Sequence, residues 1–275
     1  TGVNSGSVRA IYLSSSAPTC STVVSLNSIS GASYTSATQS TGEFSGISVV
    51  NGSTAVPLSL NVSDNTFANL SLKTTGLVYC INASYSAPAN GSKTIRNNSI
   101  TGQLVRTSTS GTSAMYGYYD NGSSPSSVSH VISGNNFSNM NNGVSTGALY
   151  GIYSLDYNST NPSLSVYNNT VSNLTAARSL TGIYLNGFSG TAAAPNAVYG
   201  NTISNLSGGN GTPTTSAVNV NGLQVGAQVL YLDVRDNIVS GLSSVLAGNV
   251  TGFNCSGATN QLSLFRNRVY SLSCA

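Results

Sequence analysis

Charged residues are scarce in this sequence, and their scarcity excludes one large class of protein. Nine residues are Lys or Arg and six are Asp or Glu, which is 5% of the 275 residues, and the formal net charge is +3. Nine isolated cations neutralise few phosphate groups, whereas a nucleic-acid surface gathers many Lys and Arg side chains on one face. The sequence therefore predicts no nucleic-acid partner.

Residues that favour helices are also rare. Trp is absent, His occurs once and Met twice, while Ser plus Thr account for 77 positions and Asn for 33. Ser, Thr, Asn and Gly are poor helix formers, and no apolar run approaches the ~20 residues of a membrane span. Hydrophobic residues nevertheless make up 39% of the chain, which is more than a disordered chain carries. An all-β protein of low charge is the class that remains.

One short phrase recurs along the whole chain, in forms such as VYNNTVSNL and VYGNTISNL. Its central asparagine occurs eight times. The first and the last are 240 residues apart, and the seven intervals between them average about 34 residues. The position three residues before it is always aliphatic, and the position two residues after it is always apolar. A second phrase with the same period, in forms such as GIYS and GIYL, precedes each asparagine. The eight asparagines, called the ladder asparagines below, are Asn27, Asn65, Asn98, Asn135, Asn169, Asn201, Asn237 and Asn267.

Each repeat predicts a coil of three short strands. Apolar residues alternate with polar ones at a period of two, which is typical of strands, and Gly or Asn recurs four residues after the ladder asparagine, which indicates a positive φ. Stacked coils would pair each strand with its counterparts at ~4.8 Å, and the aligned asparagines would hydrogen-bond to one another. We predict an all-β, single-domain right-handed parallel β-helix over residues 1–275. Its eight coils lie near residues 8–42, 43–73, 74–113, 114–147, 148–178, 179–217, 218–247 and 248–275.

These phrases resemble the right-handed parallel β-helix family, in which asparagine ladders and stacked Ile or Val columns are familiar. The repeat wording is similar to that of secreted, repeat-rich surface proteins of bacteria, over roughly residues 8–275. The family holds polysaccharide lyases and hydrolases, phage tailspikes, adhesins and passive fibres, so the resemblance implies a fold without choosing an activity. It also implies an extracellular or cell-surface location.

Two groups of residues are candidates for work on glycans. Asp120 and Asp156 follow equivalent strands of adjacent coils and form the best carboxylate pair for a glycan-active enzyme. Tyr119, Tyr153 and Tyr184 occupy the same place in consecutive coils, and we expect them to stack as an outward stripe. Such a stripe is either a surface that contacts glycans or simply a packed outer face.

Cysteines, glycosylation sequons and one charged pair complete the candidate sites. Cys255 and Cys274 share a coil and can pair, Cys20 and Cys274 can meet between copies, and Cys80 reads as a buried small hydrophobe. No metal site or cofactor is expected, because His130 is the only histidine and the cysteines lack metal-binding spacing.

Asp236 and Arg266, one residue before their ladder asparagines, should pair across one coil. Candidate glycosylation acceptors in loops are Asn90, Asn121, Asn158 and Asn210.

Both ends of the predicted coil stack lack a polar cap. We therefore expect either a fragment of a longer rod or ends that are covered by other copies of the chain. The favoured hypothesis is a non-enzymatic, extracellular structural solenoid that stacks head to tail or belongs to a longer fibre, with copies of itself as partners and no membrane span. The alternatives are a glycan-active enzyme or tailspike that uses Asp120 and Asp156, and a glycan-binding adhesin that uses the tyrosine stripe.

Overall fold

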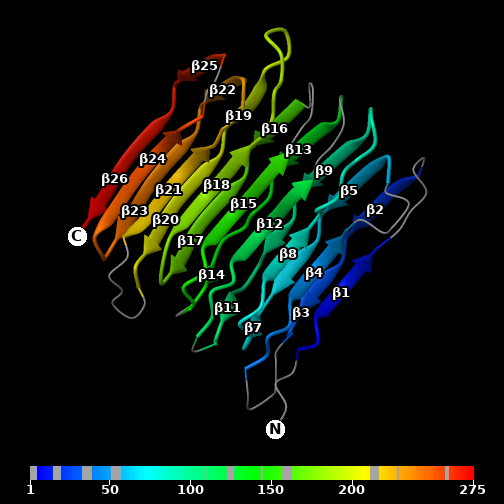
Figure 1. Ribbon diagram of the computed structural model, residues 1–275, viewed down its shortest axis with the longest axis vertical. Coiled ribbons are helices and arrows are strands. Elements are labelled where there is room, and N and C mark those ends of the chain that lie inside the picture. Colours follow the sequence, from blue (N-terminus) through cyan, green and yellow to red (C-terminus); the bar gives the residue numbers. More distant parts are fainter. Residues whose placement is uncertain are drawn as a thin grey trace.

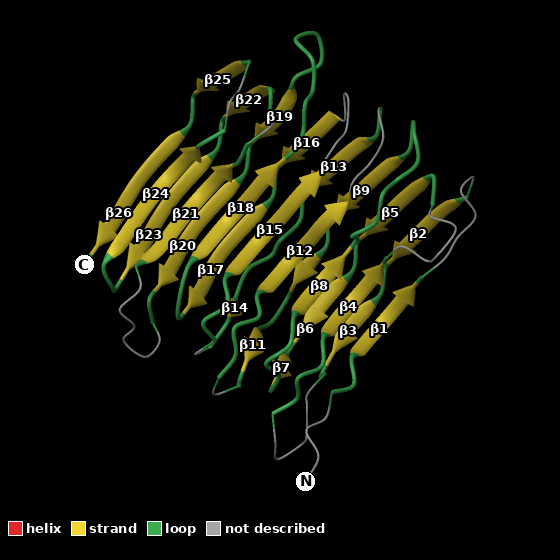
Figure 2. Ribbon diagram, in the orientation of Figure 1, coloured by secondary structure: helices red, strands yellow, loops and turns green. Residues whose placement is uncertain are grey.

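The chain folds into a parallel β-solenoid (Figure 1). The computed structural model describes residues 5–14, 20–32, 39–50, 57–108, 110–122, 127–143, 145–156, 163–210, 217–227, 229–257 and 260–275. Within these ranges all regular structure is β-strand, and every strand pairing is parallel (Figure 2). Over the same ranges the structure has no helix that is long and apolar enough to cross a bilayer.

Three sheets run along the solenoid. Sheet A contains β1 (Val8–Leu13), β4 (Phe44–Val49), β8 (Val78–Asn82), β12 (Met115–Gly122), β15 (Leu149–Asp156), β18 (Leu180–Asn186), β21 (Val218–Val225) and β24 (Gly248–Cys255). Sheet B contains β2 (Ser21–Ser25), β5 (Ser59–Ser63), β9 (Ser92–Arg96), β13 (Ser129–Ser133), β16 (Ser163–Tyr167), β19 (Asn196–Tyr199), β22 (Tyr231–Arg235) and β25 (Gln261–Phe265).

Sheet C is divided into two parts. The smaller part contains β3 (Ser28–Ser30), β6 (Thr66–Ala68) and β10 (Ser99–Ile100). The larger part contains β7 (Leu70–Leu72), β11 (Leu104–Arg106), β14 (Met140–Asn141), β17 (Thr170–Ala176), β20 (Thr202–Gly208), β23 (Ile238–Ser244) and β26 (Arg268–Cys274). Sheets A and B contain eight strands each, and successive strands of a sheet are one turn apart. The solenoid therefore makes about seven full turns, slightly fewer than the eight complete coils that the sequence predicts.

The interior is filled by the apolar columns that the repeat predicts. Val62, Ile95 and Val198, each three residues before a ladder asparagine, are completely buried, as are Phe67 and Val171 two residues after one. Burial of this kind contributes about 25 cal/mol per Å² of apolar surface removed from water. Because every coil contributes the same positions, one continuous core runs along the solenoid axis.

The glycine of the second phrase allows sheet A to approach sheet C closely. A Cβ placed on Gly182 would lie 2.6 Å from Cγ2 of Ile203, and a Cβ on Gly222 would overlap Cγ1 of Val239. Neither glycine has a positive φ, so their role is to leave space for a side chain rather than to permit an unusual backbone. The recurrence of glycine at this position follows from inter-sheet packing.

The predicted asparagine ladder is present along the whole solenoid. At each step the backbone N–H and the side-chain Nδ2 of one ladder asparagine donate to Oδ1 of the next, as from Asn169 to Asn201 at 3.0 and 2.9 Å. Asn201 Nδ2 in turn donates to the carbonyl oxygen of Val166 at 2.9 Å. The ladder asparagines from Asn65 to Asn237 are at most 1% exposed, so the ladder supplies hydrogen bonds that water cannot.

Two residues beside the ladder adopt the left-handed backbone conformation. Seven of the eight predicted positions, four residues after the ladder asparagine, have φ between 52° and 67°, and Gly102 is the exception. The residue just before the ladder asparagine also has a positive φ in every coil. Sequence analysis did not predict this, because the residues at that position include Leu26 and Arg266 as well as Asp, Asn and Gly.

Arg266 and Asp236 pair as predicted, with Nε–Oδ1 and Nη2–Oδ2 distances of 2.7 and 2.8 Å.

Replacing one ladder asparagine tests how much the ladder stabilises the fold. We expect Asn201→Ala to lower the free energy of unfolding by ~1–3 kcal/mol, because buried donors and acceptors in three coils lose their partners. Ser204→Ala, three residues later and partly exposed, is the control and should cost less than about 0.5 kcal/mol. Urea denaturation followed by circular dichroism measures both, and equal losses would show that the ladder is not the stabilising element.

Candidate functional site

Asp120 and Asp156, the predicted carboxylate pair, lie in the interior of the solenoid. Asp120 is on β12 and Asp156 ends β15, and neither side chain is exposed. Asp120 accepts hydrogen bonds from the hydroxyl group of Tyr118 at 3.3 Å and from the backbone N–H of Gly122 at 3.1 Å. The two carboxylates therefore face the core side of sheet A and not its outer surface.

Lys93 supplies the counterion of Asp120. Its ammonium group on β9 lies 2.8 and 2.9 Å from the two carboxylate oxygens, and it also donates to the carbonyl oxygens of Ala83 and Tyr85 at 3.2 and 2.6 Å. The ammonium group is 4.3 Å from the centre of the Tyr85 ring. A buried charge is tolerated only where its donors are satisfied in this way.

His130 lies between the two aspartates. Its Nε2 is 3.0 Å from Asp156 Oδ2 and its Nδ1 is 3.6 Å from Asp120 Oδ2, although neither ring nitrogen is aligned for a hydrogen bond. Each contact is an ion pair only when the imidazole ring is protonated. Lys93, Asp120, His130 and Asp156, called the interior ionic cluster below, join strands of sheets A and B in three successive coils.

Burial of the interior ionic cluster bears on the enzyme alternative. A sugar could reach Asp120 or Asp156 only by displacing the side chains that cover them, and this argues against a catalytic pair. The catalytic role of the two aspartates stays an untested prediction.

Sequence analysis missed Lys93 and His130 as members of the cluster. Both lie five residues before a ladder asparagine, at an inward position that is Leu in four other repeats, and a polar residue in that column was the signal.

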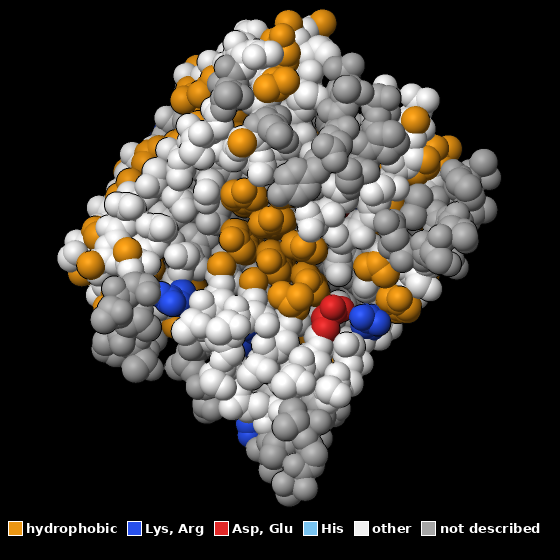
Figure 3. Space-filling model, in the orientation of Figure 1, with side chains coloured by type: hydrophobic (Ala, Val, Ile, Leu, Met, Phe, Trp, Pro, Cys, Tyr) orange, Lys and Arg blue, Asp and Glu red, His pale blue; other side chains and the backbone are white. Residues whose placement is uncertain are grey.

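The predicted tyrosine stripe is present and is part of a larger cluster on the outer face of sheet A. Tyr119, Tyr153 and Tyr184 stack with ring centres 5.2 and 4.9 Å apart. A second column, of Tyr79, Tyr116 and Tyr150, stacks beside it at 5.3 Å per step. These six residues are called the tyrosine cluster below, and Figure 3 shows a hydrophobic patch near the centre of the view. Ring faces within the columns cover one another, as expected of a packed outer face.

Packing changes the ionisation of these tyrosines. Burial raises the pKa of Tyr116 and Tyr79 well above the ordinary value of 10.0, and the neighbouring Tyr119 adds to both shifts. Burial also raises the pKa of Tyr150, with a smaller contribution from Tyr184. The phenols of Tyr79, Tyr116 and Tyr150 therefore stay protonated at neutral pH.

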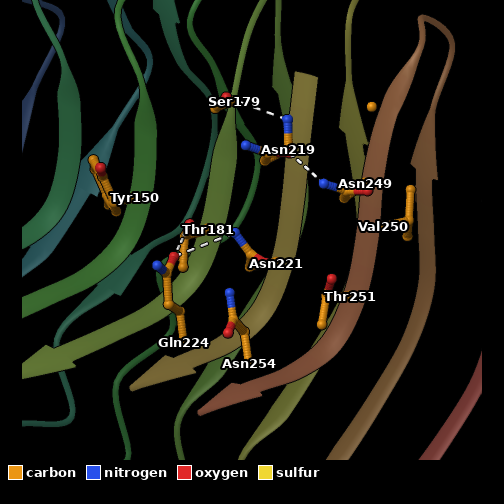
Figure 4. Close-up of a pocket in the computed structure, with 11 residues that line it drawn as sticks. Tyr150, Ser179, Thr181, Asn219, Asn221, Gln224, Asn249, Val250, Thr251 and Asn254 are labelled. Carbon is orange, nitrogen blue, oxygen red and sulfur yellow. Dashed lines mark hydrogen bonds between the residues drawn. The ribbon is translucent and has the colours of Figure 1, made fainter. Parts of the chain in front are cut away.

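A polar groove of about 430 Å³ adjoins the tyrosine cluster on sheet A. The strand register continues the tyrosine columns into it, because Thr181 is paired with Tyr150, and Gln224 with Tyr184. Figure 4 shows the side chains that surround this sheet A groove. Its lining residues are Tyr150, Ser179, Thr181, Asn219, Asn221, Gln224, Gly248, Asn249, Val250, Thr251 and Asn254.

The two ends of the solenoid expose apolar interior side chains. At the first coil a hollow of about 390 Å³ is lined by residues that include Ile11, Ile29 and Phe44. At the last coil Leu264 and Val269, which belong to inward columns, are 52% and 42% exposed. We call these surfaces the first-coil face and the last-coil face.

Cysteines and sequons take the following places. All four cysteines are free thiols; Cys80 is buried as predicted, and Cys274 is exposed. The Cys255–Cys274 pairing is not formed, and a bond between Cys20 and Cys274 of two copies stays a prediction. Among the candidate acceptors, Asn90, Asn121 and Asn210 are exposed, whereas Asn158 lies outside the described residues.

Comparison of the chain with family models, curated proteins and solved structures found no match. Function must therefore be argued from the chain's own residues.

The Lys93–Asp120 pair predicts a large penalty for removing one buried charge. Asp120→Ala should lower the free energy of unfolding by ~3–5 kcal/mol, because the Lys93 ammonium loses its counterion in the core. Adding Lys93→Leu should recover part of the loss, since Leu60 and Ala83 occupy the corresponding places one coil earlier. Asp233→Ala, which breaks a partly exposed pair with Arg235, is the control and should cost about 1 kcal/mol or less. Equal costs for Asp120→Ala and Asp233→Ala would contradict this account.

Raised tyrosine pKa values predict that the fold weakens in alkali. The folded-state pKa exceeds the unfolded one, so the stabilisation is complete below about pH 10 and is lost as the pH rises further. Melting temperature should fall as the pH rises above about 10, and the fall should be smaller in a Tyr116→Phe, Tyr150→Phe variant. Burial raises the pKa of the Cys80 thiol as well, so the comparison of variants isolates the tyrosine contribution. A variant that loses stability as steeply as the parent would refute it.

Proposed function

We propose that this chain is a structural β-solenoid whose copies associate head to tail through the first-coil face and the last-coil face. The observation that carries the proposal is the polarity of the asparagine ladder. Each ladder asparagine from Asn65 to Asn237 donates to the next one towards the last coil and accepts from the previous one, whereas within the ladder Asn27 only donates and Asn267 only accepts. The two ends of the ladder are therefore of opposite kind.

Hydrogen-bonding groups at the two ends complement each other. Within the described residues, no donor reaches Oδ1 of Asn27, and the backbone N–H of Asn267 has no acceptor. In the proposed joint, Asn267 of one copy donates to Asn27 of the next, as Asn237 donates to Asn267 within the chain at 3.1 and 3.0 Å. The ladder and all three sheets would then continue across the joint.

Apolar complementarity supports the same contact. The first-coil face is hollow, and the last-coil face presents the partly exposed side chains of Leu264, Val269 and Leu272. Inserting these side chains into the hollow removes apolar surface from water at both ends. Because the contact joins two different faces, it does not close on itself and generates a linear filament.

An extracellular or cell-surface location belongs to the same proposal, and the proposal assigns the chain no catalytic role. Support for the location comes from the low charge and the abundance of Ser, Thr and Asn, together with the resemblance of the repeats to surface proteins.

Blocking one face at a time tests the proposal. Ile11→Arg should disable the first-coil face and Val269→Arg the last-coil face, so each variant alone should be monomeric, whereas the parent chain forms filaments. Each variant keeps the face that the other has lost, so an equimolar mixture should form heterodimers and stop there. Sedimentation velocity and negative-stain microscopy measure all three states.

The control is Val23→Arg, which places the same charge on the first coil but on the outer surface of β2, where Val23 is 62% exposed. This variant should assemble like the parent. A parent chain that stays monomeric at the highest attainable concentration would refute the proposal, and dimers formed by one variant alone would show a symmetric contact instead.

A further inference from the structure

The sheet A groove combines side chains that suit a neutral sugar. None of its lining residues is Asp, Glu, Lys, Arg or His. Eight of the eleven, Asn254 among them, are Ser, Thr, Asn or Gln and carry a side-chain amide or hydroxyl. A surface of uncharged donors and acceptors matches the hydroxyl groups of a carbohydrate, whereas phosphate, sulfate or uronate groups are recognised by cationic side chains.

Hydrogen bonds within the groove leave further groups available to a ligand. Thr181 Oγ1 and Asn221 Nδ2 both donate to Gln224 Oε1, at 3.4 and 3.2 Å, which orients the Gln224 amide (Figure 4). Asn249 Nδ2 donates to Asn219 Oδ1 at 3.3 Å. Within the described part of the chain, the Gln224 amide nitrogen has no acceptor. These side chains are held in place before a ligand arrives, which reduces the entropy lost on binding.

Tyr150 supplies an aromatic platform at one side of the groove. One face of its ring stacks on Tyr116 at 5.3 Å, and the next residue in the column, on the side of the groove, is Thr181 rather than another aromatic. Tyr184 approaches Tyr150 edge-on, at 6.1 Å between ring centres. The tyrosine column therefore ends at Tyr150, and the ring face that would meet the next aromatic is turned toward the groove, where the apolar face of a sugar ring can pack.

We propose that the sheet A groove binds a neutral oligosaccharide, with Tyr150 as the stacking platform and Asn221, Gln224 and Asn254 among the hydrogen-bonding groups. Its volume of about 430 Å³ is that of a small-molecule site. A peptide strand is a poorer occupant, because the groove lies on the face of a sheet and offers no unpaired strand edge. This site differs from the predicted stripe, whose inner rings are covered by one another.

Binding is tested by isothermal titration calorimetry with hexasaccharides of glucose, mannose, xylose and N-acetylglucosamine, and with hexagalacturonate as the charged counterpart. We expect at least one neutral hexasaccharide to bind and hexagalacturonate to bind more weakly. Tyr150→Ala should weaken binding about tenfold, and Asn254→Ala about fivefold. Tyr150→Phe keeps the ring and should stay within about threefold of the parent.

Tyr199→Ala is the matched control, because Tyr199 stacks on Tyr167 at 4.9 Å on the outer face of sheet B and lies outside the groove. It should bind like the parent. Asn254 is a surface residue whose replacement leaves the tyrosine cluster intact, so it tests the site even if Tyr150→Ala unfolds. Absence of binding by all four neutral sugars, equal binding of hexagalacturonate, or binding that Asn254→Ala leaves unchanged, would overturn the proposal.

Discussion

The hydrogen bonds of the buried corner between sheets B and C are the constraint on which this solenoid depends. At that corner the chain turns twice through the left-handed region around one asparagine, and some backbone groups, such as the N–H of Asn169 and the carbonyl of Val166, bond to ladder side chains rather than to another strand. A side-chain amide satisfies them because it offers both donors and an acceptor, and because the same amide recurs 4.8 Å away in the next coil. Each coil thus depends on its neighbours for its own hydrogen bonds, as expected of a repeat protein.

Once the corner and the glycine column are in place, outward positions are free to vary along the axis. Sheet A uses this freedom to place aromatic residues on its middle coils and amides or hydroxyls on later ones, in the same two columns. Stacking favours like residues in successive coils, so a change of residue type within a column leaves one side chain with an uncovered face. The boundary at Tyr150 arises in this way, and it is the most distinctive feature of the outer surface.

Charge is as unevenly distributed as aromatic residues. Lys93, Asp120, His130 and Asp156 are all buried in one cluster, so the surface carries even fewer charges than the composition implies. Such a cluster stabilises less than an apolar core of equal volume, because desolvation opposes the attraction between the charges. It links β9, β12, β13 and β15 through side-chain contacts of 2.8 to 3.6 Å.

Sequence alone determined the fold class, the ladder asparagines, the stacking of Tyr119 on Tyr153 and the Asp236–Arg266 pair, because each depends on residues that recur at one fixed period. It also brought Asp120 and Asp156 into adjacent coils. Only the tertiary structure decided that these carboxylates point inward to Lys93 and His130, because this depends on how the strand ends of sheet A face the inner side of sheet B. The sheet A groove could not be predicted from the repeat period either, because its shape arises where side chains of different size meet across neighbouring strands.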